Sequence, residues 1–266
     1  MSWTLFKSNI RSNRFIFLLI SLIFFFYMAI IMTLYDPDQI DALNEMLAMM
    51  PETMIRAMNF STLGNTLLTF ISDYIYGFLV FLFPMIMVIT INHRLVAVLV
   101  DRGSMAFLLA SPLSRKKIIL TQMAFSIVSV SALFFLNTLF SILLANRMFP
   151  GELELGKFIL INLYALIMYY AISSICFFAS TIAQEAKTSL SIGVGVPVGF
   201  LVLQMLGNAD DSLSFIGNLS LYALFDPSAV ILGTGFMVTG MVVLFSFAVV
   251  FYGLSGVIFI RKNLYV

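Results

Sequence analysis

The sequence predicts an all-α integral membrane protein with six transmembrane helices. Three observations lead to this expectation. Hydrophobic residues make up 61% of the 266-residue chain and charged residues only 10%, whereas soluble domains carry about 25% charged residues. The mean hydropathy is +1.06. The apolar residues gather in six long uncharged runs separated by short polar segments. Because a water-soluble fold of this length could not bury so much apolar surface, lipid must cover part of it.

The length of each run sets the predicted spans. A spanning helix needs about 20 mostly apolar residues, because the hydrocarbon core is about 30 Å thick and each residue rises about 1.5 Å. Within one transmembrane domain covering residues 1–266, we predict spans at about residues 15–35, 72–92, 118–145, 158–183, 188–209 and 233–260. Pro84 interrupts the second run, and three glycines around Pro197 predict a kink in the fifth.

A short interfacial helix, or elbow, is predicted before the first span, over residues 1–14. Its apolar and basic residues occupy adjacent helix faces: Trp3, Phe6 and Ile10 on one, Lys7, Arg11 and Arg14 on the other. Such a helix can lie in the headgroup layer of the lipid bilayer, with its basic side toward anionic lipid. The alternative is a plain positive flank that only orients the first span.

The basic residues predict the orientation. With the N-terminus in the cytoplasm, 11 of the 14 Lys and Arg residues fall in inner segments, and only Arg56, Arg147 and Lys157 fall in outer ones. An excess of basic residues in cytoplasmic loops is the usual topology signal. We therefore expect a multi-pass protein of the cell membrane with both termini in the cytoplasm.

The inner loop over residues 93–117 is the segment with the clearest functional pattern. Met105, Leu108 and Leu109 form a short apolar face between Arg102-Gly103 and Ser111-Pro112. A small amphipathic helix of this kind could dock on a soluble partner. Periodicity alone leaves equally open a basic loop that only fixes topology.

The loop also resembles that of a known family. An acidic residue, Gly-Ser, then Leu, Pro and a basic residue resemble the inner-loop pattern of ABC-2 type permeases, the transmembrane subunits of type-2 ABC exporters: Asp101, Gly103, Ser104, Leu108, Pro112, Ser114 and Arg115. Members of the family usually carry Glu at the position of Asp101. The chain end, Phe259-Ile260-Arg261-Lys262-Asn263-Leu264, also resembles the family ending, with Asn263 where Asp is common.

The resemblance implies a function and partners. The inner loop would be a cytoplasmic coupling helix that docks on a separate ATP-binding subunit, which holds ATP and Mg, so this chain needs no cofactor. The implied contact residues are Asp101, Arg102, Gly103, Ser104, Met105, Leu108, Leu109, Pro112 and Arg115. Two permease subunits, as a homodimer or heterodimer, would pair with two ATPase subunits. Residues 212–228 would form short outer re-entrant helices, and no nucleic-acid partner is expected.

The sequence offers little for catalysis. Residues 151–157 match a nucleotide-binding P-loop up to its last position, where Phe158 replaces the hydroxyl that holds magnesium. No strand precedes the segment, and it lies on the predicted outer side. One histidine, His93, and one cysteine, Cys176, are too few for a metal site or a nucleophile–base pair.

Three other function classes were compared with the permease. An ion-coupled secondary transporter usually keeps an ionisable residue near the bilayer midplane, and the six runs have none, although sodium coupling through carbonyls and hydroxyls stays open. The sequence lacks the nucleophile–base pair or metal ligands that a membrane enzyme would need. A non-transport assembly protein stays an alternative. The sequence thus favours an exporter permease. Its uncharged spans, rich in Phe and Met, suit an amphipathic or apolar cargo such as a peptide, lipid or drug.

Overall fold

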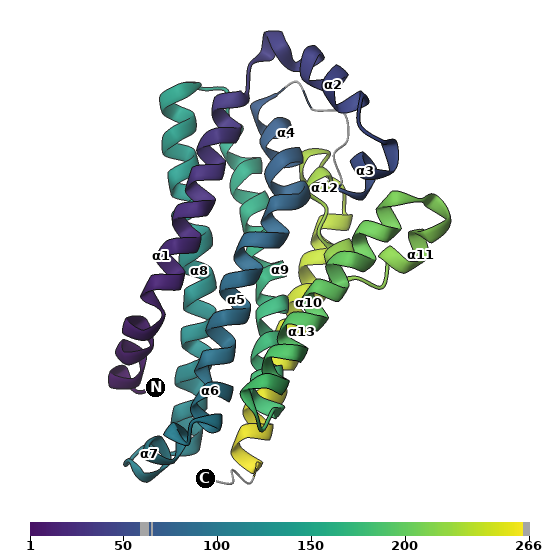
Figure 1. The fold of residues 1–266 in the computed structure, drawn as a ribbon. Coiled ribbons are helices and arrows are strands. Elements are labelled where there is room, and N and C mark those ends of the chain that lie inside the picture. Colours follow the sequence, from purple (N-terminus) through teal and green to yellow (C-terminus); the bar gives the residue numbers. More distant parts are fainter. Residues whose placement is uncertain (59–63, 65, 263–266) are drawn as a thin grey trace.

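The computed structural model describes residues 1–58, 64 and 66–262, which form a bundle of long helices (Figure 1). The described residues contain no β-strand. The start of α1 (Trp3–Leu34) and the end of α13 (Phe236–Arg261) lie at one end of the bundle, together with the short helix α7 (Ser104–Ala110). We call this the α7 end. The opposite end carries α2 (Ile40–Ala48) and is called the α2 end.

Six helices among the described residues are long and apolar enough to cross a membrane, which confirms the predicted all-α, six-span fold. They are α1, the composite helix Leu67–Asp101, α8 (Arg115–Met148), α9 (Leu155–Ile182), α10 (Ala186–Ala209) and α13. Helix α9 is central, because it packs against α5, α8, α10 and α13.

The first helix corrects one expectation. The sequence predicted a separate interfacial helix ending at residue 14, but α1 is continuous from Trp3 to Leu34. No Gly or Pro interrupts these 32 residues, and the start of α1 is fixed to α8, where the Ser2 backbone N–H donates to Thr121 Oγ1 at 2.8 Å. At about 1.5 Å per residue, α1 is about 48 Å long, so it exceeds the hydrocarbon core. A position in the headgroup layer stays a prediction for its first turns.

The second span is longer than predicted and irregular. It consists of α4 (Leu67–Ile71), a π-helix over Ser72–Leu79, α5 (Val80–Leu95) and α6 (Ala97–Asp101). Pro84 lies inside α5 rather than at a break. The disturbance appears instead in the preceding turns as the π-helix, a rare form that often marks functional sites.

Side chains of α9 donate hydrogen bonds to backbone carbonyls of the two spanning helices that contain a proline, α5 and α10. Pro84 has no N–H, which leaves the carbonyl four residues earlier without its helical donor, and the Tyr169 hydroxyl donates to that carbonyl, on Val80, at 2.6 Å. Helix α10 is likewise helical through Pro197. There the Cys176 thiol approaches the freed Gly193 carbonyl at 3.5 Å. Buried donors on α9 therefore allow two prolines inside spanning helices.

Short helices cover the α2 end. Besides α2, they are α3 (Glu52–Ala57), α11 (Ser214–Gly217), α12 (Pro227–Ile231) and three 3-10 turns, Pro37–Gln39, Asp211–Leu213 and Leu221–Leu224. Helices α11 and α12 and the last two turns lie in the region expected to be re-entrant, but entry into the bilayer stays a prediction. A Cβ on Gly207 would lie 2.4 Å from the Cα of Gly217. The hairpin of α10 and α11 therefore requires glycine at this contact.

Candidate functional site

The segment that resembles a coupling helix forms a short helix at the α7 end. Helix α6 ends at Asp101, and the chain turns at Gly103, whose φ of 70° is left-handed and favours glycine. Helix α7 follows over Ser104–Ala110, and α8 begins at Arg115, capped by the Ser114 hydroxyl, which accepts from the Lys117 N–H at 3.3 Å. Helix α7 thus extends from the end of the bundle between two long helices (Figure 1).

The faces of α7 are reversed from the expectation. Met105 is completely buried, and Leu108 and Leu109 pack half-buried against the core, so the predicted docking face holds α7 to the bundle. The exposed apolar residue is Phe107, with 79% of its surface accessible. At 100° per residue, Phe107 lies opposite the other three on the helix. Its large aromatic side chain, among the small residues Ser104, Ala106 and Ala110, was the signal that the sequence offered.

Asp101, although exposed, forms a hydrogen bond with the start of α10. Its carboxylate Oδ1 accepts from the Ala186 backbone N–H at 3.2 Å, in the first turn of α10. A carboxylate stabilises a helix start, because the first N–H groups have no intrahelical acceptor and the dipole is positive there. In addition, the Ala97 N–H donates to the Ser180 hydroxyl of α9 at 2.9 Å. Helix α6 is therefore fixed to both α9 and α10.

Lys262 closes the same end of the bundle. Its ammonium donates to the last carbonyls of α9, those of Thr181, Ile182 and Ala183, at 3.1, 2.9 and 2.7 Å. A cation is favourable here because the terminal carbonyls lack helical donors. Desolvation at this site lowers the pKa of Lys262 below its usual value. The Lys262 carbonyl accepts in turn from Arg115 Nη1 at 2.8 Å. The start of α8 is therefore linked to the ends of α9 and α13.

The remaining predicted coupling residues divide by exposure. Arg102 and Pro112 are exposed, whereas Gly103, Ser104 and Arg115 are half-buried. Among the described residues, no carboxylate pairs with Arg102. We define the α7 surface as Arg102, Phe107 and Pro112, which provides an exposed aromatic ring and an exposed cation without a carboxylate partner.

The predicted interfacial residues at the start of α1 also divide by exposure. Phe6 is buried and packs edge-on against Phe125 of α8, with ring centroids 5.3 Å apart. Trp3 is 69% and Ile10 46% exposed. The basic residues are all exposed: Lys7, Arg11 and Arg14. The predicted single apolar face is therefore shared between the bundle and the surroundings.

A buried polar cluster was missed by the sequence analysis. Asn92 of α5, Ser126 of α8, Ser173 of α9 and Tyr252 of α13 meet one another with 8% exposure or less. Ser126 donates to Asn92 Oδ1 at 2.6 Å, and Asn92 Nδ2 donates to Ser173 at 2.9 Å. The Tyr252 hydroxyl lies 2.8 Å from Ser126 and donates to Ser173 at 2.9 Å. These spans contain several uncharged polar residues each, so the sequence alone did not single out these four.

The apparent P-loop and the single histidine have structural partners. Lys157 pairs with Glu154 at 2.9 Å across one turn at the start of α9. His93 Nδ1 lies 3.2 Å from the Ser189 hydroxyl. Over residues 1–58, 64 and 66–262, no three His, Cys, Asp or Glu residues lie close enough to bind a metal ion.

Comparison with known proteins adds the family. A family model described as "ABC-2 family transporter protein" matches residues 2–264, nearly the whole chain. No curated protein and no solved structure has significant similarity to the chain.

Proposed function

The chain belongs to the ABC-2 family of transporter proteins, and we propose that it is the permease subunit of an exporter driven by a separate ATP-binding subunit. The family and the six apolar helices make it a multi-pass membrane component of an ABC transporter. Coupling to the ATPase, the direction of transport and the cargo are the proposed parts.

The observation that carries the coupling proposal is the exposure of Phe107. A ring with 79% of its surface accessible in the middle of α7 adds little to the packing of the fold, whereas an aromatic anchor often dominates the binding energy of an interface. Arg102, five residues earlier and also exposed, suits an acidic rim on the partner. ATP and magnesium are assigned to that partner, in agreement with the pairing of Lys157 to Glu154.

The contacts around α7 support a mechanical route into the bundle. Motion of α7 reaches α10 through Asp101 and reaches α9 and α13 through Lys262. The buried side chain of Met105, on the inner side of α7, fixes this helix to the core. ATP shifts the permease only if its two nucleotide states bind the permease conformations with different affinity. No residue of this chain needs to do covalent chemistry.

The proposal includes an arrangement in the cell membrane. The α7 end, with both termini, faces the cytoplasm, because 11 of the 14 basic residues lie on that side in this topology. A second permease subunit completes the translocation path. The spans carry no charge near their centres, which favours an amphipathic or apolar cargo.

The test uses Phe107→Glu in cells that also express the cognate ATP-binding subunit. A glutamate at a docked position buries an unpaired charge, which costs several kcal/mol, and each ~1.4 kcal/mol is a factor of ten in affinity. We expect at least a tenfold loss of ATPase co-purification and of ATP-dependent export, with normal membrane insertion.

The matched control is Phe215→Glu on α11. This ring is 64% exposed and lies on a short helix away from the α7 end, so the same substitution should leave assembly and export intact. Normal co-purification and export by Phe107→Glu would exclude the coupling role of the α7 surface. Leu108→Glu is less suitable, because Leu108 packs against the core.

A further inference from the structure

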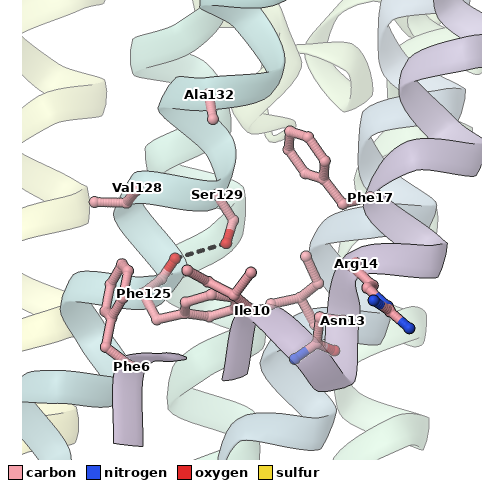
Figure 2. A pocket seen from close by; sticks show the side chains of 10 residues that line it. Phe6, Ile10, Asn13, Arg14, Phe17, Phe125, Val128, Ser129 and Ala132 are labelled. Atoms are coloured by element: carbon pink, nitrogen blue, oxygen red, sulfur yellow. Dashed lines mark hydrogen bonds between the residues drawn. The ribbon is translucent and has the colours of Figure 1, made fainter. Parts of the chain in front are cut away.

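A groove lies between the start of α1 and the first half of α8 (Figure 2). Its volume is about 210 Å³. The walls are mostly apolar, with Phe17 from α1 and Phe125, Val128 and Ala132 from α8. We call this space, together with Ile10, Asn13 and Arg14 at its edge, the α1–α8 groove.

The groove changes from charged to apolar along its length. In Figure 2, Arg14 and Asn13 lie at one end, and Phe17 and Ala132 lie toward the other. The Asn13 amide oxygen has no hydrogen-bond partner among the described residues. Because α1 enters the bundle from the α7 end, the polar end faces the membrane surface and the apolar end faces the bilayer interior. A phospholipid has the same order of headgroup and chain.

The surface beside the groove is basic. A second hollow of about 680 Å³ is lined by Trp3, Lys7, Arg11 and Arg14, and it shares Ile10 and Arg14 with the α1–α8 groove. The three cations repeat at intervals of four and three residues, so they occupy one side of α1. Within the part of the chain that the structure describes, none of them has a carboxylate partner.

We propose that this site binds one anionic phospholipid, with its phosphate on Arg14 and its basic neighbours and part of one acyl chain in the α1–α8 groove. Charge complementarity selects the headgroup, since Lys7, Arg11 and Arg14 offer unpaired positive charge where headgroups lie. The groove selects a chain over a soluble anion, because its walls are apolar. The inference does not depend on coupling to an ATPase.

Trp3 provides the measurement. It is the only tryptophan of the chain, it is 69% exposed, and it lines the basic hollow. The full chain, purified in neutral detergent, is titrated with phosphatidylglycerol that carries a nitroxide quencher near the headgroup end of one acyl chain. Phosphatidylcholine with the same label is the reference. We expect half-maximal quenching by phosphatidylglycerol at a mole fraction at least fivefold lower.

Two variants test the two parts of the site. Arg14→Gln should reduce the preference for phosphatidylglycerol about fivefold, the change expected for one basic residue at an anionic surface. Ala132→Phe fills the groove, so it should weaken quenching by both lipids several-fold. Lys187→Gln, an exposed cation on α10, and Val249→Phe, on the exposed face of α13, are the matched controls and should leave both titrations unchanged.

The outcomes separate the possibilities. Equal quenching of the unmodified chain by the two lipids, or an unchanged preference in Arg14→Gln, overturns the headgroup site. Unchanged titrations with Ala132→Phe overturn the acyl-chain groove. Arg14 is exposed, so its variant keeps the packing intact and decides the headgroup question even if Ala132→Phe does not fold.

Discussion

The two ends of the bundle are held together in different ways. At the α7 end, Asp101 caps α10 and Lys262 caps α9. Each residue of the buried polar cluster, Asn92, Ser126, Ser173 and Tyr252, has a partner on another helix. At the α2 end, Arg56 of α3 forms an exposed ion pair with Asp211, and the Tyr164 hydroxyl of α9 donates to the Leu224 carbonyl. The buried Asn137, in the half of α8 toward that end, has no hydrogen-bond partner for its amide oxygen or nitrogen among the described residues.

The α7 end is therefore joined mainly by hydrogen bonds between long helices, whereas apolar packing contributes more at the α2 end. Hydrogen bonds between buried groups fix the distance between helices, whereas dispersion contacts with neighbours or lipid are non-directional. We therefore expect the helices at the α7 end to move as one unit and those at the α2 end to separate more readily. In the proposed exporter, this pattern suits a drive applied at α7 and an opening at the opposite end.

The largest expected effect comes from the two buried asparagines. Asn92 is 1% exposed and Asn137 is fully buried, so the same change to leucine compares a paired amide with an unpaired one. Asn92→Leu removes two bonds between helices and should cost about 1–2 kcal/mol of unfolding free energy. Asn137→Leu should be neutral or stabilising, because it removes an unsatisfied polar group.

Reversible unfolding of both variants in one detergent measures the difference. Equal destabilisation by Asn92→Leu and Asn137→Leu would contradict the contrast between the two ends.

A smaller effect is expected at the latch formed by Lys262. Lys262→Met keeps the length of the apolar stem but removes the donors to the end of α9, and it should cost about 1 kcal/mol. Arg261→Met is the control, because Arg261 is exposed and, among the residues that the structure describes, no hydrogen bond of its side chain links it to another helix. Amide exchange at the end of α9 is the direct measurement. Protection equal to that of the unmodified chain would show that the ammonium does not fix this helix end.

The smallest effect is expected at the outer ion pair. Arg56→Gln should change the unfolding free energy by less than about 1 kcal/mol, because exposed ion pairs are weak and screened by salt. Thermal unfolding at low and high ionic strength measures this effect. A larger loss, insensitive to salt, would mean that the α2 end is held as firmly as the α7 end.

Hydropathy and Pro–Gly placement were sufficient to predict the six spans and the short helix at the α7 end. In lipid, a spanning chain must satisfy its backbone hydrogen bonds internally, so long uncharged runs become helices whatever their neighbours. A short helix also lies between Gly103 and Pro112, where the sequence predicted one. The interfacial segment was predicted as a separate helix, whereas it forms the first turns of α1. Its contacts with Thr121 and Gln122 of α8 could not be read from the sequence.

The sequence by itself therefore determined an all-helical membrane protein with six spans and the position of the segment proposed for coupling. Only the tertiary structure decided which side of that segment faces outward and which polar residues meet. Helix α7 carries apolar side chains on both of its sides, so periodicity does not separate the buried Met105 from the exposed Phe107. The partners of Asp101 and Lys262 lie about 80 residues away along the chain, and only packing of the helices brings them into contact.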